Sequence, residues 1–212
     1  AEMVRICRLD AWPLATQSVR DVGLNGTVRV QVTDPAGNPM NGALVTVLTS
    51  HTPVGVSTDS AGRVTIANVA AVPALQVKAY DEGMVYHEAH INLSAGSVAD
   101  ARIALPAPSA GGQTPSVAGA GIQPSSGAGN AAVAFSVTAT DPQGRLNLAE
   151  DQIFALNPSI GLAYVLRHTG GDQYSAQVTL PGLSQGTHTW YFFAVDHQCN
   201  TSNILSASYT VG

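Results

Sequence analysis

The sequence predicts an all-β protein of two antiparallel β-sandwich domains joined by a Gly/Pro/Ser-rich linker. Short segments such as residues 27–32 alternate apolar and polar side chains, and this period of two is typical of half-buried strands. Asp-x-x-Gly turn signals separate such segments at residues 34–37, 59–62 and 141–144. The 212 residues are enough for two domains of about 100 residues, each able to bury a core.

The first domain is expected over residues 23–105. Its opening strand ends at Asp34-Pro35-Ala36-Gly37, where Asp in first place, Pro in second and Gly in fourth suit a type I turn. Later alternating strands are expected over residues 75–80, 89–93 and 101–105. About seven short strands bounded by Gly, Pro and Asn are typical of a sandwich.

This domain carries the motifs G-x-V, D-x-x-G-x-P, A-x-V and T-D-x-x-G-x-V in that order. The residues that form them are Gly26, Val28, Asp34, Gly37, Pro39, Ala43, Val45, Thr58, Asp59, Gly62 and Val64. The series resembles the carboxypeptidase regulatory-like domains, which have a transthyretin-like fold. The resemblance implies a non-catalytic accessory module of a secreted or surface protein. Pilin-type relatives carry an internal Lys–Asn isopeptide bond, but the only lysine here, Lys78, is not in the first strand, so sortase-linked assembly is not expected.

Residues 106–121 are rich in Pro, Gly, Ser and Ala and are expected to form the linker. The second domain is expected over residues 122–212, with a first strand near Val133 and a helical turn only near Leu146–Gln152. Residues 190–195, Trp-Tyr-Phe-Phe-Ala-Val, are apolar on both faces, as expected of a central strand that is covered on two sides.

The C-terminal part of the second domain carries most of the pattern G-T-x-x-x-Y-x-x-A-x-D-x-x-G-N-T. The matching residues are Gly186, Thr187, Tyr191, Ala194, Asp196, Asn200 and Thr201. Cys199 stands where the pattern has Gly. This ending resembles bacterial immunoglobulin-like and fibronectin type III-like domains, which implies a sandwich fold and says little about function.

Charged residues make up only 11% of the chain, against about 25% in typical soluble domains. Such a surface fits a covering by glycan or by neighbouring subunits better than a freely diffusing cytosolic protein. The net charge of −5 and the pI near 5.5 argue against a nucleic-acid partner. No run approaches the roughly 18 apolar residues of a membrane span. We expect a secreted, processed protein that is extracellular or at the cell surface, with the periplasm as the alternative.

Residues 1–22 precede the first strand of either domain and carry an apolar set of their own. Its members are Met3, Val4, Ile6, Leu9, Trp12 and Leu14. Because such side chains are unfavourable in water, we expect the segment to be covered. One interpretation is a strand packed on its own chain, and the other is a strand donated to the sheet edge of a neighbouring subunit. Head-to-tail repetition of the second contact predicts a homo-oligomer or filament.

The two cysteines, Cys7 and Cys199, predict one disulfide, either within the chain or between neighbouring subunits. Cysteine in place of a turn glycine gives up backbone freedom, and a covalent bond would offset that loss. Three N-x-S/T sequons make Asn25, Asn92 and Asn200 glycosylation candidates in an organism that glycosylates secreted proteins.

The sequence contains no P-loop, G-x-S-x-G, H-E-x-x-H, C-x-x-C or dinucleotide fingerprint. His87 and His90 are three residues apart in a predicted strand, so they point to opposite faces and do not form a metal pair. Trp190 with His188 has two interpretations, a sugar-stacking shelf and, in preference, core packing of the tryptophan. The turn aspartates are explained by turn chemistry and lack the several oxygen ligands that calcium needs. We expect no catalytic residue, metal or cofactor.

Two classes of function follow. The first is a non-catalytic extracellular structural protein, a subunit of a filament, sheath or cell-surface assembly built by β-strand and sandwich contacts. The alternative is an accessory or carbohydrate-binding module of a secreted enzyme or periplasmic complex, with a cell-surface or glycan contact. An enzyme is disfavoured, because the sequence has no legible nucleophile–base or paired-acid arrangement.

Overall fold

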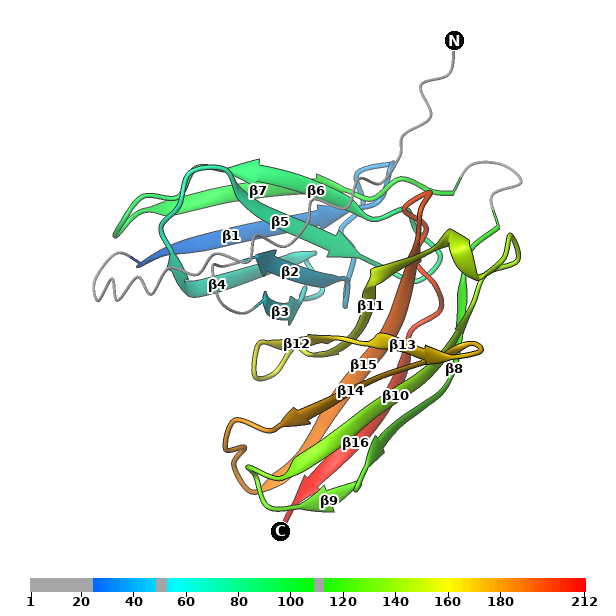
Figure 1. Ribbon diagram of the computed structural model, residues 1–212. Helices are drawn as coiled ribbons and strands as arrows, with labels where there is room; N and C mark the ends of the chain where they lie inside the picture. Colours follow the sequence, from blue (N-terminus) through cyan, green and yellow to red (C-terminus); the bar gives the residue numbers. More distant parts are fainter. Residues whose placement is uncertain (1–24, 49–52, 109–112) are drawn as a thin grey trace.

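The computed structural model describes residues 25–48, 53–108 and 113–212, and these form two β-sandwiches in succession (Figure 1). The predicted all-β class is confirmed. The N-terminal segment, residues 1–22, lies outside the described residues, so the predictions on its apolar set and on Cys7 stay predictions.

In residues 25–48 and 53–105, which the structure describes, the first domain has seven strands in two sheets. They are β1 (Asn25–Thr33), β2 (Leu44–Leu48), β3 (Pro53–Ser57), β4 (Arg63–Ala70), β5 (Leu75–Tyr80), β6 (His87–Ile91) and β7 (Val98–Ala104). Sheet I has the order β4-β1-β7, and sheet II has the order β3-β2-β5-β6. The β1–β7 pair is parallel, from Thr27 opposite Val98 to Thr33 opposite Ala104, and so departs from the purely antiparallel expectation. The chain crosses to sheet II between β4 and β7, and this crossover allows β7 to return alongside β1 in the same direction.

The second domain contains nine strands in two sheets. They are β8 (Ser116–Gln123), β9 (Ser126–Gly127), β10 (Ala132–Thr140), β11 (Leu148–Asn157), β12 (Leu162–Val165), β13 (Arg167–Gly170), β14 (Gln173–Thr179), β15 (Gly186–Asp196) and β16 (Leu205–Val211). Sheet III has the order β12-β11-β15-β16-β9, with β9 parallel to β16, and sheet IV has the order β13-β14-β10-β8. In the described ranges the helical content is one 3-10 turn, Arg145–Asn147, close to the expected position.

The predicted linker differs from the structure in its second half. Residues 116–121 belong to β8, which pairs with β10, so this domain begins before its expected first strand near Val133. Val117 and Ile122 of β8 are buried in the domain core. The Ala- and Gly-rich composition resembled that of a linker, because small residues do not give a clear alternation of apolar and polar side chains. The backbone of these residues nevertheless forms the edge strand of sheet IV.

Each sandwich has its own apolar core. In the first, the inward positions Val28, Val30 and Val32 of β1 are at most 2% exposed, as the alternation predicted. In the second, Trp190 is fully buried, with its ring centroid 4.7 Å from Phe135. The predicted core packing of the tryptophan is therefore correct, and the sugar-stacking shelf is not formed.

A third apolar core lies between the two domains. The first domain contributes Leu44, Tyr80 and Tyr86 to it. The second domain contributes Phe154, Leu156, Ala163, Phe193, Val195 and Cys199. The Tyr80 ring centroid is 5.1 Å from that of Phe193 and 6.0 Å from that of Phe154. Where the domains meet, sheets II and III therefore have apolar side chains on both faces, and the outer faces of sheets I and IV take no part in this core.

Backbone hydrogen bonds join the domains beside this core. The Tyr86 N–H donates to the Cys199 carbonyl at 2.8 Å, and the Thr201 N–H donates to the Met84 carbonyl at 2.8 Å. Close approach also requires glycine at position 55 of β3. A Cβ atom there would lie 2.6 Å from Leu156 Cγ, well inside van der Waals contact.

We predict that Gly55→Val weakens the contact between the domains without disturbing either domain's own core. Overpacking of this kind costs about 1–3 kcal/mol. In calorimetry the parent chain should unfold in one transition, and Gly55→Val should unfold at lower temperature, with the two domains resolved. Ser57→Val is the matched control, because Ser57 is exposed on the same strand. Equal melting of the two variants would contradict the close packing at Gly55.

Candidate functional site: an arginine-lined groove on the first domain

The outer face of sheet I carries a concentration of arginine. Because Val28, Val30 and Val32 of β1 point into the core, the alternate residues Arg29 and Gln31 point outward. The strand register places two rows across this face. One row is Arg63, Gln31 and Arg102, and the other is Thr65, Arg29 and Asp100.

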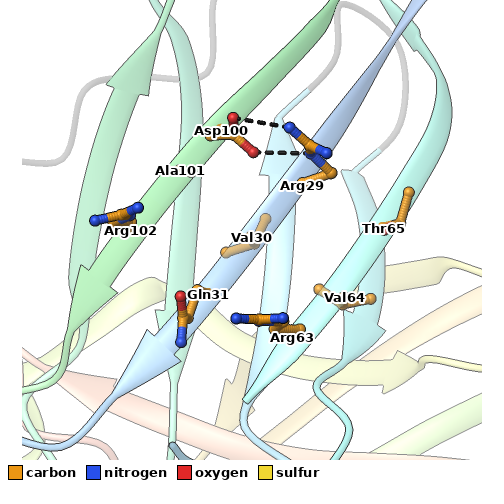
Figure 2. Close-up of a pocket in the computed structure, with 9 residues that line it drawn as sticks. All are labelled: Arg29, Val30, Gln31, Arg63, Val64, Thr65, Asp100, Ala101 and Arg102. Atoms are coloured by element: carbon orange, nitrogen blue, oxygen red, sulfur yellow. Dashed lines mark hydrogen bonds and ion pairs between the residues drawn. The ribbon is translucent and has the colours of Figure 1, made fainter. Parts of the chain in front are cut away.

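These two rows line a shallow hollow of about 310 Å³, drawn in Figure 2. Figure 2 shows Gln31 between Arg102 on one side and Arg63 on the other, with the Arg29–Asp100 pair at the opposite end. A second hollow of about 270 Å³ adjoins the first along β1 and β7, beside Gln31, Thr33 and Arg102. Together the two hollows form a groove, called here the arginine groove.

Arg29 is held by an acidic neighbour. Its Nε donates to Asp100 Oδ1 at 2.8 Å and its Nη2 donates to Asp100 Oδ2 at 3.0 Å, a bidentate pair. The hydrogen bonds from Arg29 hold the pKa of Asp100 below its usual value, and the same contact raises the pKa of Arg29. Both side chains are exposed, so the pair orients Arg29 more than it stabilises the fold.

Arg63 and Arg102 are exposed and, within the described residues, have no hydrogen-bonded carboxylate. They lie on the two strands that flank β1, so their backbones are about 10 Å apart, two strand spacings. Three arginines and one aspartate give the groove a charge of +2, although the whole chain carries −5. The groove is therefore a local cationic surface suited to binding an anion.

The strand that holds His87 and His90 is β6, as expected. His87 is opposite Ala79 and His90 is opposite Gln76, positions that belong to the two faces of sheet II. No group of three His, Cys, Asp or Glu side chains suited to a metal occurs in the described part of the chain. The ring of His188 is buried, with its Nε2 2.8 Å from the Ser184 carbonyl oxygen.

The four Asp-initiated turns share one geometry. In each, the N–H of the fourth residue donates to the carbonyl of the aspartate, at 2.9–3.0 Å. The fourth residues are Gly37, Gly62, Gly144 and Cys199, with φ angles of 88°, 69°, 100° and 71°. In the first turn Asp34 accepts hydrogen bonds from the Asn38 side chain and backbone, and these lower the pKa of Asp34. The aspartate carboxylates therefore accept hydrogen bonds within their own turns.

Among the three sequon asparagines, Asn200 is the buried one. It is 5% exposed, and its Nδ2, the atom that would carry the sugar, donates to Asp196 Oδ2 at 2.7 Å. Asn200 is a turn-stabilising residue. Burial raises the pKa of Asp196, which the hydrogen bonds from Asn200 partly offset. Asn25 and Asn92 are exposed, and their glycosylation stays a prediction.

Cys199 combines two constraints. Its φ of 71° lies in the left-handed region that favours glycine, and its side chain is 8% exposed within the interdomain core. Because Cys7 lies outside the described residues, the Cys7–Cys199 disulfide stays a prediction.

The sequence carried a signal for the arginine groove that composition could not reveal. Arg29, Arg63 and Arg102 each occupy an outward position of an alternating strand. Only the strand order and register show that the three outward positions share one face. Within the described residues, no helix is long and apolar enough to span a membrane.

Residues 27–106 match the carboxypeptidase regulatory-like domain family. This match covers the first domain and agrees with the resemblance noted from its motifs. Curated proteins gave no match to the chain.

Solved structures with similar architecture are distant in sequence. The Bacillus anthracis TIE protein is 12% identical to this chain, with a TM-score of 0.36. The alignment covers 89% of this chain and 31% of the TIE protein chain, so this chain spans about a third of the length of that one. BcpA, the major pilin subunit of Bacillus cereus, is 11% identical with a TM-score of 0.32, over 88% of this chain and 69% of that one. A putative carbohydrate-binding protein from Bacteroides uniformis is 13% identical with a TM-score of 0.31, and the alignment covers 85% of this chain and 97% of that one. At these identities and TM-scores the likeness supports no conclusion about this chain.

The Arg29–Asp100 pair predicts a pH dependence of known sign. Because the folded-state pKa of Asp100 is lowered, its contribution is present above the unfolded value of about 3.9 and is lost as the pH falls through the folded value. A carboxyl-carbon NMR titration should place the Asp100 midpoint below that value in the parent and close to it in Arg29→Gln. Arg167→Gln, which removes an exposed arginine of the second domain, should leave the midpoint unchanged. An identical midpoint in the parent and in Arg29→Gln would contradict the pairing.

The predicted disulfide has its own test at Cys199. Reduction should lower the free energy of unfolding of the parent by about 2–4 kcal/mol, measured by denaturant titration with and without reductant. Cys199→Gly and Cys7→Ser should each be insensitive to reductant. Non-reducing electrophoresis then separates an intrachain from an interchain bond. Two alkylatable thiols in native material would refute the disulfide.

Proposed function

We propose that this chain is a non-catalytic extracellular structural protein, a subunit of a filament, sheath or cell-surface assembly. The interdomain core is the observation that carries the proposal. Tyr80, Phe154 and Phe193 pack against one another across the domain boundary, and main-chain hydrogen bonds lie beside them. The two sandwiches therefore behave as one block, in contrast to two modules on a flexible tether.

A rigid block suits repeated assembly. Each added subunit loses less conformational freedom when its domains are already fixed relative to each other. The outer face of sheet IV also suits contact with a neighbour, because its outward side chains on β10 and β14 are small or neutral. Ser136, Thr138, Gln173 and Ser175 are among them, and Gln173 Nε2 donates to Thr138 Oγ1 at 2.7 Å. Covering the β10–β14 part of this face removes no ionised group from water, and Arg167 of β13 lies at its border.

The proposed assembly element is the N-terminal segment with its apolar set. A strand of this kind docks on a sheet edge, where unpaired backbone groups are available. Strand β13 offers such an edge in sheet IV, and all four of its residues are exposed. We propose this edge as the acceptor for the segment of a neighbouring subunit, which gives a heterologous contact that need not close.

The alternative function is an accessory or carbohydrate-binding module of a secreted enzyme or periplasmic complex. The arginine groove is the specific observation that favours it, since a cationic hollow on an exposed sheet face serves binding and not packing. The two functions are compatible, because the groove lies on the outer face of sheet I, which the interdomain core leaves free.

Removal of residues 1–22 tests the assembly role. Negative-stain images and light scattering of native material should show fibres or large oligomers, and the shortened chain should give soluble two-lobed monomers whose thermal unfolding equals that of full-length Cys7→Ser. The control is Cys7→Ser in the full chain, which separates loss of the segment from loss of a disulfide. Assembly that survives the deletion, or a native protein that is already monomeric, would refute the proposal.

A further inference from the structure

We propose that the arginine groove binds an acidic polysaccharide through the carboxylates of successive uronic acid residues. The site goes beyond the assembly role, because it involves none of the residues assigned to that role. The proposal rests on the exposed guanidinium groups of Arg63 and Arg102, which form no hydrogen bond or close ion pair with a carboxylate among the described residues.

The two arginines are placed for a ligand with more than one anionic group. Their strands flank β1, and Gln31 lies between them with its amide in the same row. A guanidinium presents paired N–H donors that match a carboxylate, so each arginine can take one carboxylate. Gln31 can then hydrogen-bond a hydroxyl or ring oxygen between the two charges. A linear polymer with a carboxylate on each sugar meets this arrangement as it crosses the sheet.

The second row explains the preference for a sugar acid over a simple polyanion. Arg29 is already neutralised by Asp100, and the Asp100 carboxylate would repel a further anion at that end of the groove. The same carboxylate accepts hydrogen bonds from hydroxyl groups, and the Thr65 hydroxyl beside Arg29 can donate or accept. The groove therefore offers cations in one row and hydroxyl partners in the next, and a uronic acid carries both chemical groups.

Two other classes of ligand fit less well. The lining contains no aromatic side chain on which a nucleic-acid base could stack. An acidic peptide would gain most from backbone pairing at a sheet edge, whereas the groove crosses the face of sheet I and is bordered by side chains. An acidic peptide also lacks the dense hydroxyls that the Asp100 row can bind.

The exposure of the groove sets the expected strength. Solvent-exposed ion pairs are weak and sensitive to salt, so one groove should bind an oligosaccharide in the millimolar range at low ionic strength. Several chains held on one polymer would bind far more tightly, because each later contact is intramolecular. A weak single site is therefore sufficient for a surface protein present in many copies.

The test uses the full chain and a galacturonic acid hexamer as the probe. Titration by NMR at about 0.05 M salt should shift the backbone amides of residues 29–31, 63–65 and 100–102, and the shifts should diminish at about 0.5 M salt, where the Debye length is shorter. Arg63→Gln/Arg102→Gln should weaken binding at least tenfold. Arg145→Gln/Arg167→Gln removes the same charge outside the groove and should retain most of the affinity.

Three further results would overturn the proposal. They are shifts away from the groove, equal losses in the two double variants, and binding of the methyl-esterified hexamer as strong as that of the free acid. A polyglutamate peptide that binds as tightly as the hexamer would replace the polysaccharide with an acidic protein partner. The deletion of residues 1–22 leaves the groove residues in place, so failure of assembly and failure of polysaccharide binding are separate outcomes.

Discussion

The contact between the two sandwiches is the constraint on which the rest of this structure depends. Tyr80, Phe154 and Phe193 fill the space between sheets II and III, and the close approach at Gly55 brings Leu156 against β3. Burial of these side chains makes the inner sheets apolar on both faces. It follows that the outer faces of sheets I and IV take no part in this contact, and the arginine groove lies on the first of them.

The sequence predicted those features that depend on neighbouring residues. The alternation of Val28, Val30 and Val32 predicted which face of the strand points into the core. The Asp-x-x-Gly spacing predicted turns, and the fourth residue of each turn has a positive φ. The double-sided apolar run at residues 190–195 indicated a strand covered twice, but nothing in it identified the first domain as the second cover. Strand β8 escaped recognition because its alanines and glycines resemble a linker, and its pairing with β10 depends on residues distant in sequence.

The arginine groove belongs to the class of features that a sequence cannot reveal by itself. Arg29, Arg63 and Arg102 are spread over more than seventy positions and become neighbours only through the order β4-β1-β7. Asn200 illustrates the converse, since its sequon is intact although the fold uses its amide to hold Asp196. For the arginines the register of the strands decides what the side chain does, and for Asn200 the local turn geometry decides it.

The parallel pairing of β1 with β7 has a mechanical consequence. The first domain's chain enters through the start of β1 and leaves at the end of β7, and in a parallel pair these two points lie at opposite ends of the ladder. Tension along the chain therefore slides the two strands past each other, and the hydrogen bonds from Thr27 to Thr33 are loaded together and do not open one at a time. If the first domain is pulled from its two ends, it should resist extension at this ladder before its antiparallel hairpins unzip.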